Sequence, residues 1–314
     1  MIRRTLLVLL TALAGVVLPP VTATADPGPA RILDVRPLGG RQLEVVVHSA
    51  AMDRPITLWV SNAGQGAPVL YLLNAVDGGE DGGPWTRRTD VAEFYADKPI
   101  TVVVPMGGRA SYYTDWQADD PVLGRNRWST FLGDELPPLL QQRFGAADRM
   151  AVAGVSMSAT SALNLAIEHP GRFRAVGAFS GCPRTSDPAA RAMVYAQLGV
   201  FGANATNMWG GPADPAWPAH DPTLNADRLR GTALYISAGN GLPGRHDSLA
   251  EPDRAVVGGI MESVIGPCTG SFLARLAELG IPAATDLRTG THAWPYWQDD
   301  LRNSWPVIAA AVGA

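Results

Sequence analysis

Short apolar segments rich in β-branched residues recur along the chain and alternate with longer amphipathic or small-residue segments. Several of the short segments are hydrophobic throughout, which is typical of strands buried on both faces of a parallel sheet. The predicted strands are Leu43–His48, Ile56–Val60, Val69–Leu73, Ile100–Pro105, Met150–Val155, Ala175–Ser180, Ala233–Ser237 and Ala284–Leu287. The first strands follow one another closely, which indicates an antiparallel lead-in to the sheet.

The longer segments between the strands predict helices at Trp128–Phe144, Ser158–Glu168, part of Val256–Gly280, and Trp305–Val312. Alternation of strand and helix favours a mostly parallel α/β sheet with helices on both faces. Proline and glycine concentrate in Pro183–Pro222, which we interpret as a long loop excursion. Because the chain shows no internal repeat and no linker, we expect residues 26–314 to form a single domain.

The N-terminus has the pattern of a signal peptide covering residues 1–25. Arg3 and Arg4 precede an apolar run from Leu6 to Leu18, and small residues then surround a cleavage site after Ala25. The apolar run is short for a membrane span, which needs about 20 residues, although an uncleaved anchor remains the alternative. We therefore expect the mature chain to act outside the cytoplasmic membrane.

Composition narrows the partners and the chemistry. A net charge of -4 argues against nucleic acid, which favours a basic surface. No metal-binding or nucleotide-binding motif is present, so we expect no metal and no cofactor. In an exported protein, Cys182 and Cys268 are expected to form a disulfide, with two buried thiols as the alternative. Closing a loop of that length stabilises a fold by roughly 4 kcal/mol in the chain-entropy model.

The sharpest local pattern lies at Ser156. A hydrophobic strand runs into Gly154-Val-Ser156, and a helix of small and apolar residues follows at once. This context is typical of the nucleophile elbow of the α/β-hydrolase fold, in which a tight turn exposes the serine hydroxyl. The N–H of Met157, at the helix N-terminus, is a candidate oxyanion donor. Ser158 stands where glycine is usual, and a chance match to so short a motif is the alternative.

A serine nucleophile needs a base, and the fold places it after the acid, late in the chain. His292 follows a predicted strand and precedes the last helix, which is the expected position; His220 and His246 are weaker candidates. The acid stays open on the residues alone. Fold logic favours a carboxylate soon after the strand Ala233–Ser237, such as Asp247, and the later candidates are Glu251, Asp253, Glu262, Glu278 and Asp286.

The second oxyanion donor in this fold comes from the loop after an early strand. Here the strand Val69–Leu73 leads into a glycine-rich turn, in which the N–H of Val76 is well placed to donate. The alternative is that this turn only ends the strand.

Several motifs together resemble the secreted mycolyltransferases of mycolic-acid-containing actinobacteria, the antigen 85 family and its corynebacterial and nocardial relatives. The resemblance runs from about Pro68 to the C-terminus, and the spacing of His292 among three aromatic residues is its most specific part. The motifs are Tyr71–Asn74, Val104–Gly108, Tyr112–Trp116, Trp128–Pro137, Gly154–Ser158, Asn207–Gly210, Ser237–Gly241 and Gly290–Trp297.

The resemblance implies a Ser-Glu-His triad, and Glu262 matches the family position of the acid. It implies acyl transfer: a mycolyl group would pass from trehalose monomycolate, through Ser156, to trehalose monomycolate or cell-wall arabinogalactan. It also implies a secreted or envelope location, with peripheral contact with the mycolate outer layer. A Cys182–Cys268 bridge would then connect the Glu262 segment to the loop after the strand ending at Ser180.

Two departures from the family concern sugar recognition. Asn74 and Asp77 stand where mycobacterial members carry an Asp and an Arg that contact trehalose, so a cationic position becomes anionic. Trp209 and Trp294 are retained and are expected to form apolar or sugar-stacking walls, with core packing as the alternative. Two other functions stay open: a secreted carboxylesterase with the same triad, and a non-enzymatic relative that binds host matrix.

Overall fold

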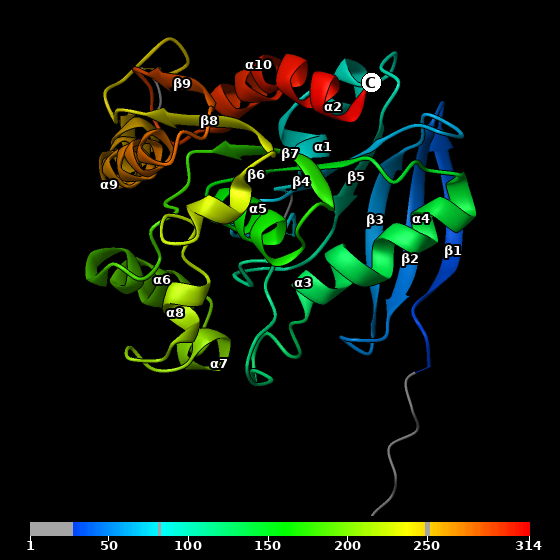
Figure 1. Ribbon diagram of the computed structural model, residues 1–314, viewed down its shortest axis with the longest axis horizontal. Coiled ribbons are helices and arrows are strands. Elements are labelled where there is room, and N and C mark those ends of the chain that lie inside the picture. Colours follow the sequence, from blue (N-terminus) through cyan, green and yellow to red (C-terminus); the bar gives the residue numbers. More distant parts are fainter. Residues whose placement is uncertain (1–27, 81–82, 249–251) are drawn as a thin grey trace, which may run out of the picture.

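A nine-stranded mixed sheet forms the centre of the computed structural model, which describes residues 28–80, 83–248 and 252–314 (Figure 1). The predicted signal peptide lies outside these residues, so the division at residue 25 stays a prediction. The strand order is β1-β2-β3-β5-β4-β6-β7-β8-β9. The strands are β1 Arg31–Gly39, β2 Gln42–Ser49, β3 Arg54–Ser61, β4 Val69–Leu73, β5 Thr101–Pro105, β6 Met150–Val155, β7 Phe173–Phe179, β8 Ala233–Gly239 and β9 Ala284–Arg288.

The first three strands and the pairing of β3 with β5 are antiparallel, whereas β5, β4, β6, β7, β8 and β9 run parallel. The predicted parallel sheet with an antiparallel lead-in is therefore confirmed. β4, β5 and β6 are buried along their whole length, as their continuous apolar sequence predicts. β1 was not predicted, because this edge strand is largely exposed and carries charged residues among its apolar ones.

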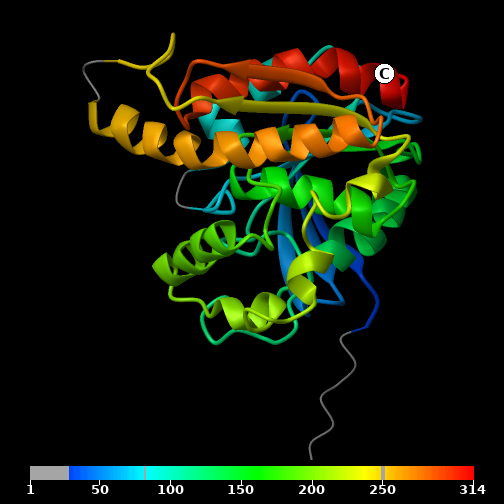
Figure 2. The same cartoon turned by 60° about the vertical axis from the view of Figure 1, so that its left-hand side comes forward.

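Helices cover both faces of the sheet. α10 lies on one face with the short helices α1 and α2, while α4, α5 and α9 lie on the other (Figures 1 and 2). The helical segments are α1 Trp85–Arg88, α2 Val91–Phe94, α3 Trp128–Thr130, the π-helical turn Phe131–Glu135, α4 Leu136–Phe144, α5 Met157–Glu168, α6 Pro188–Val200, α7 Ala205–Trp209, α8 Ala216–Ala219, the 3-10 turn Ala226–Leu229, α9 Pro252–Glu278 and α10 Trp294–Val312.

Alternation along the strands divides the core between these two layers. In β4, Tyr71 and Leu73 face the α5 side, whereas Leu70 and Leu72 face the α10 side with Trp297. Each face therefore buries its own apolar cluster, which is what a sheet covered on both faces requires.

The excursion between β7 and β8 differs from the prediction, because it contains helices α6 to α8 rather than a loop. α6 begins where the Asp187 side chain accepts a hydrogen bond from the Ala189 N–H and Pro188 occupies the first turn. α10 also begins earlier than predicted, at Trp294, and continues through Pro306.

The carboxyl ends of the parallel strands meet at one edge of the sheet. Ser156 follows β6, Gly239 ends β8, and His292 lies just after β9. In open α/β sheets this edge is where ligands bind, so the fold brings the candidate residues to a common place.

Candidate active site

The turn at Ser156 is a strained strand-to-helix connection. Ser156 has φ 55° and ψ -123°, a left-handed conformation that costs a non-glycine residue about 1–3 kcal/mol. A Cβ atom added at Gly154 would lie 2.2 Å from the Ser158 carbonyl oxygen, and one at Gly181 would lie 2.5 Å from Ala159 Cβ. The two glycines are therefore required, because the strand and helix backbones approach closely around Ser156.

Ser158, which replaces the usual glycine, is fully buried and bonded to the backbone around the turn. Its hydroxyl accepts from the Val155 N–H at 2.9 Å and lies 3.1 Å from the Leu73 carbonyl oxygen of β4. The extra side chain therefore fits the turn, because its oxygen satisfies polar groups that would otherwise be buried without partners.

Ser156, His292 and Glu262 form a continuous chain of close polar contacts. Ser156 Oγ lies 2.8 Å from His292 Nε2, and His292 Nδ1 lies 2.8 Å from Glu262 Oε1. The other carboxylate oxygen accepts from the Gly239 N–H at 3.0 Å. The His292 N–H donates to the Gly258 carbonyl of α9, so the backbone also fixes the ring. The His292 side chain is 5% exposed and that of Glu262 is fully buried.

The other acid and base candidates that the structure describes have other partners. Asp247 accepts hydrogen bonds from Thr291 and Tyr296, Asp286 pairs with Arg288, and Glu278 pairs with Arg275. His220 stacks on Trp209, and His246 pairs with Asp299. Glu251 and the side chain of Asp253 lie outside the described part of the chain.

The two candidate oxyanion donors lie at the start of α5 and in the turn after β4. Met157 is the first residue of α5, so its N–H belongs to the helix end that lacks intrahelical acceptors. The turn of Val76 is fixed from outside, because its carbonyl accepts from the Ala110 N–H at 2.8 Å. Within the described residues, neither N–H donates to a backbone carbonyl.

Asn74 is a correction to the sequence prediction, because its buried side chain is closed to a ligand. Its amide donates to the Pro105 carbonyl at 2.8 Å and accepts from the Trp85 N–H at 3.2 Å. Asn74 therefore braces the glycine-rich turn from within. Asp77 is half-buried, and one of its oxygens accepts from the Gly79 N–H at 3.1 Å, which stabilises the same turn.

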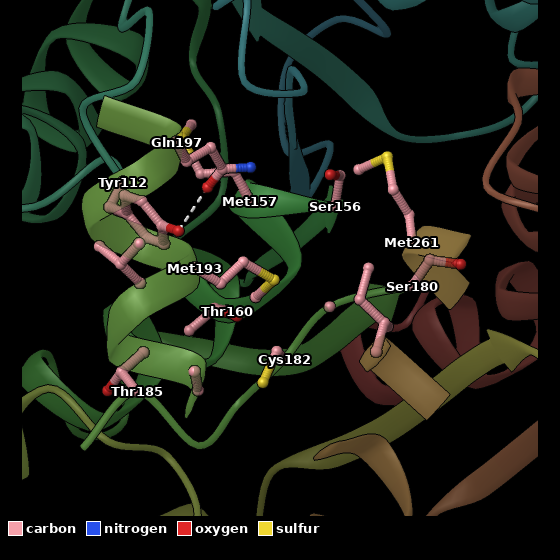
Figure 3. Close-up of a pocket in the computed structure, with 14 residues that line it drawn as sticks. Tyr112, Ser156, Met157, Thr160, Ser180, Cys182, Thr185, Met193, Gln197 and Met261 are labelled. Carbon is pink, nitrogen blue, oxygen red and sulfur yellow. Dashed lines mark hydrogen bonds between the residues drawn. The ribbon is translucent and has the colours of Figure 1, made fainter. Parts of the chain in front are cut away.

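An apolar pocket opens beside Ser156 (Figure 3). Met193 and Val194 of α6 line it from one side, and Met261 and Ile265 of α9 from the other. At one end the Tyr112 hydroxyl donates to the Gln197 side chain. Since most of the exposed lining is apolar, the pocket suits an aliphatic chain placed next to Ser156.

The two tryptophans differ in their surroundings. Trp209 is fully buried, stacks on His220 and packs edge-to-face with Tyr112, so it supports the pocket from behind. Its expected role as a substrate-contacting wall is a second correction. Trp294 is half-buried and contacts Trp297, whose ring in turn packs edge-to-face on His292.

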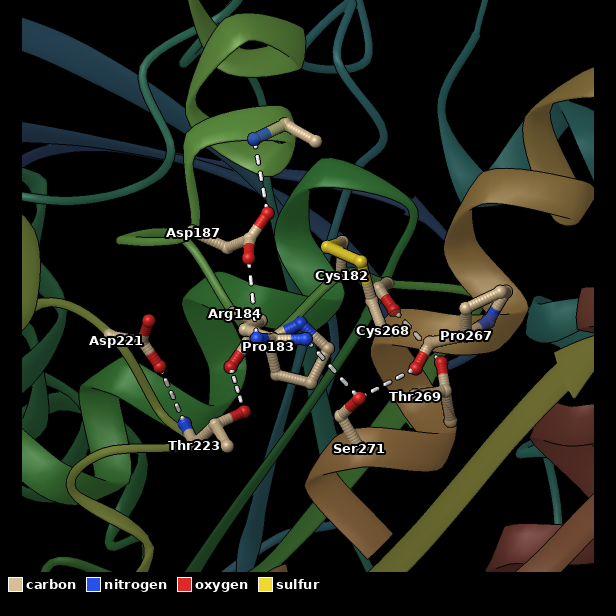
Figure 4. The surroundings of a disulfide bond; sticks show 12 residues. Cys182, Pro183, Arg184, Asp187, Asp221, Thr223, Pro267, Cys268, Thr269 and Ser271 are labelled. Carbon is tan, nitrogen blue, oxygen red and sulfur yellow. Dashed lines mark hydrogen bonds and ion pairs between the residues drawn. A yellow bond between two sulfur atoms is a disulfide. The ribbon is translucent and has the colours of Figure 1, made fainter.

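The predicted disulfide between Cys182 and Cys268 is present (Figure 4). Cys182 lies in the loop after β7 and lines the pocket, while Cys268 lies in α9, beyond Glu262. The Thr269 hydroxyl donates to the Gly181 carbonyl beside the bridge at 3.0 Å. The bridge therefore fastens α9 to the pocket wall.

The sequence analysis did not predict several pocket residues, because it did not predict the helix α6 that carries them. Met193, Val194 and Gln197 all lie on this helix. The signal was present, since Asp187-Pro188 is a typical helix start and the buried residues Ala190, Val194 and Leu198 recur every fourth position. Among the described residues, no group of three or more His, Cys, Asp or Glu side chains is arranged to bind a metal ion.

Known proteins resemble the chain along most of its length. Residues 49–306 match the family model described as "Putative esterase". The diacylglycerol acyltransferase/mycolyltransferase Ag85A of Mycobacterium tuberculosis (strain ATCC 25618 / H37Rv) is 34% identical over 277 residues, which are 85% of this chain and 80% of that protein. Ag85A of Mycobacterium leprae (strain TN) is 33% identical over 317 residues, which are 98% of this chain and 91% of that protein.

A solved structure agrees with the fold. The crystal structure of Mycobacterium tuberculosis MPT51 (FbpC1) superposes with a TM-score of 0.71 at 28% identity, covering 84% of this chain and 96% of that one. Together with the mostly parallel sheet and its helices, this similarity confirms the predicted α/β-hydrolase fold.

Proposed function

Because the chain belongs to the antigen 85 family of diacylglycerol acyltransferases/mycolyltransferases, we propose that it transfers a mycolyl group through a covalent intermediate on Ser156. Trehalose monomycolate is the proposed donor, and a second trehalose monomycolate or cell-wall arabinogalactan is the acceptor. The continuous contact chain from Ser156 through His292 to Glu262, opening onto an apolar pocket, carries this proposal.

In the first half-reaction, Ser156 Oγ attacks the ester carbonyl carbon while His292 Nε2 accepts the hydroxyl proton. Glu262 keeps the ring oriented and stabilises the imidazolium that forms. The N–H groups of Val76 and Met157 donate to the oxyanion of the tetrahedral intermediate. The bond to the sugar oxygen then breaks, His292 returns the proton to that oxygen, and the acyl group stays on Ser156.

In the second half-reaction, a sugar hydroxyl of the acceptor attacks the acyl-enzyme carbonyl while His292 again accepts the proton. The Ser156–acyl bond breaks, and the serine recovers its proton from His292. The apolar lining of Met193, Val194 and Ile265 favours the acyl chain, since burying each methylene contributes about 0.8 kcal/mol. Transfer rather than hydrolysis then depends on the acceptor outcompeting water for the acyl-enzyme.

We also propose that the enzyme acts after export, in peripheral contact with the glycolipid layer through the outer face of α9. Val256, Val257, Ile260 and Val264 on this face are 60%, 58%, 62% and 45% exposed. Between Ala255 and Ala274 the only charged side chain is Glu262, which is buried. Exposed helices normally carry charges on their outer face, so this face suits an uncharged lipid surface.

The position of α9 favours a helix that lies on the lipid layer over one that crosses it. Ala255–Glu278 is long and apolar enough to span a membrane by length and composition. Its inner face, however, packs against β8 (Figure 2). This face carries the buried Glu262, and the neighbouring Met261 lines the pocket. An acyl chain would thus pass from the layer to Ser156 along an apolar path.

Incubation of the purified chain with trehalose monomycolate tests the transfer reaction. We expect trehalose dimycolate and free trehalose from the wild type and neither from Ser156→Ala. Free mycolic acid without dimycolate would instead identify a carboxylesterase. A fluorophosphonate that labels the wild type and not Ser156→Ala would exclude the non-enzymatic alternative.

Co-sedimentation with vesicles of an uncharged glycolipid tests the contact surface. Ile260→Glu places a charge on the exposed face of α9, and Leu33→Glu places one on β1, at the opposite edge of the sheet. We expect Ile260→Glu alone to weaken vesicle binding severalfold. Equal binding by both variants and the wild type would rule out this surface.

A further inference from the structure

The turn at residues 244–247, after β8, packs against the segment that carries His292. We infer that Asp247 is a positioning residue, which fixes the backbone of His292 by way of Thr291. This inference rests on the proposed role of His292 as the base. Asp247 is the carboxylate that its position after β8 favoured as the triad acid. The inference assigns it a different role in the same site.

Asp247 uses both carboxylate oxygens to join three segments. Oδ1 accepts from the Thr291 hydroxyl, and Thr291 directly precedes His292. Oδ2 accepts from the Tyr296 hydroxyl of α10 at 2.7 Å and from the Gly244 N–H of its own turn at 2.8 Å. Thr291 and Tyr296 are 2% and 1% exposed, so two of these bonds reach donors that water barely contacts.

Close packing confines the two segments further. A Cβ atom at Gly244 would lie 2.4 Å from the Thr289 carbonyl oxygen and 2.5 Å from the Tyr296 hydroxyl oxygen. One at Gly290 would lie 2.7 Å from the Tyr296 ring. Neither glycine has room for a side chain, so the backbone of the 244–247 turn lies directly against the segment that carries His292. This close contact brings the Asp247 carboxylate within reach of Thr291 and Tyr296.

His292 needs this precision because its ring has to contact two partners at once. Nε2 and Nδ1 each lie 2.8 Å from their partner oxygens on Ser156 and Glu262. The Gly258 carbonyl of α9 fixes the His292 N–H from one side. Asp247 fixes the preceding residue from the other. A displacement of about 1 Å at a catalytic group can lower a rate by about 100-fold.

The experiment compares Thr291→Val, Asp247→Ala and the double variant. Thr291→Val removes the hydroxyl and keeps the side-chain shape, so it tests the contact even if Asp247→Ala folds poorly. Turnover of a short p-nitrophenyl acyl ester is measured per fluorophosphonate-labelled site, which corrects for unfolded protein. We expect kcat to fall about 10-fold to 100-fold in both single variants with KM unchanged, because the acyl pocket is untouched.

Three further results separate positioning from general support of the fold. The double variant should lose no more activity than the more affected single variant, because both remove the same contact. Thr291→Ser should restore kcat. Asp299→Asn is the matched control, because Asp299 pairs with Arg245 and His246 of the same turn. We expect this substitution to leave kcat near that of the wild type.

Wild-type kcat in Thr291→Val and Asp247→Ala would overturn the inference, as would losses that multiply in the double variant. An equal loss in Asp299→Asn would overturn it too, since rigidity of the turn would then suffice. Failure of the proposed transfer is recognised separately, because trehalose monomycolate would then give free mycolic acid without dimycolate while turnover of the short ester still depended on Thr291 and Asp247.

Discussion

The two parts of the site that meet at the sheet edge are built differently. In the proposed reacting part, Ser156, His292 and Glu262 are buried side chains, each hydrogen-bonded to the next. In the part expected to recognise sugar, the Asn74 amide is occupied by the backbone, and Asp77 presents a half-buried carboxylate. The proposed reaction geometry thus depends on closely packed backbone positions that few substitutions tolerate, whereas the part expected to recognise sugar offers a half-buried carboxylate.

The largest effect is expected at Glu262, the proposed triad acid, and it tests whether the reacting part tolerates substitution as poorly as its packing indicates. In Glu262→Gln, an amide replaces the carboxylate and cannot stabilise an imidazolium, so we expect kcat to fall about 10⁴-fold. Ester turnover per labelled site measures this. A loss below tenfold would show that Glu262 is not the acid.

The next largest effect is expected at Asn74, and it tests whether this side chain stabilises the fold or binds sugar. Asn74→Ala leaves the Pro105 carbonyl and the Trp85 N–H buried without their partner, so we expect the free energy of unfolding to fall by about 3 kcal/mol. Urea denaturation followed by tryptophan fluorescence measures it. Unchanged stability combined with a raised KM for trehalose would instead show that the side chain contacts sugar.

A pH dependence of the unfolding free energy, of similar size, is expected from Asp300, a buried carboxyl in α10. Burial raises its pKa to about 6, although the hydrogen bond and ion pair with Arg288 oppose the rise. Because the folded pKa exceeds the unfolded value, the folded state binds the proton more tightly, and stability falls as pH rises from about 4 to about 6. The full change is about 3 kcal/mol.

Comparison with Asp300→Asn isolates this group, since the amide has no proton to lose. Denaturation of both proteins across that pH range should show the wild type losing stability relative to the variant. A stability difference that stays constant with pH would contradict the raised pKa.

The smallest effect is expected at Asp77, where the family resemblance in the sequence predicts an arginine. Asp77→Arg restores a cation near the proposed sugar site and should lower the KM for trehalose about fivefold, equivalent to about 1 kcal/mol. Acyl transfer at varied trehalose concentration measures this, with hydrolysis of a p-nitrophenyl ester as the control. An unchanged KM would place the acceptor sugar elsewhere.

The sequence predicted those strands, helices and site residues that a short stretch of sequence identifies by itself. Buried strands such as β4 and β6 were bounded well, because a continuous apolar run leaves little choice of structure. β1 was missed because its exposed edge gives no such run, and α6 because proline and glycine surround it. Ser156 follows from its strand and helix. The partner of His292 could not be chosen from the residues, because α9 reaches the site only through tertiary packing.

The bridge between Cys182 and Cys268 encloses α6, α7, α8, β8 and Glu262 within one covalent loop, while Ser156 and His292 lie outside it. A protease that cuts the chain once anywhere inside this loop produces two fragments that stay joined through the sulfur atoms. The enzyme is proposed to act outside the cell, where exposed segments meet proteases. After a single cleavage there, the bridge would keep the pocket wall and Glu262 attached to Ser156.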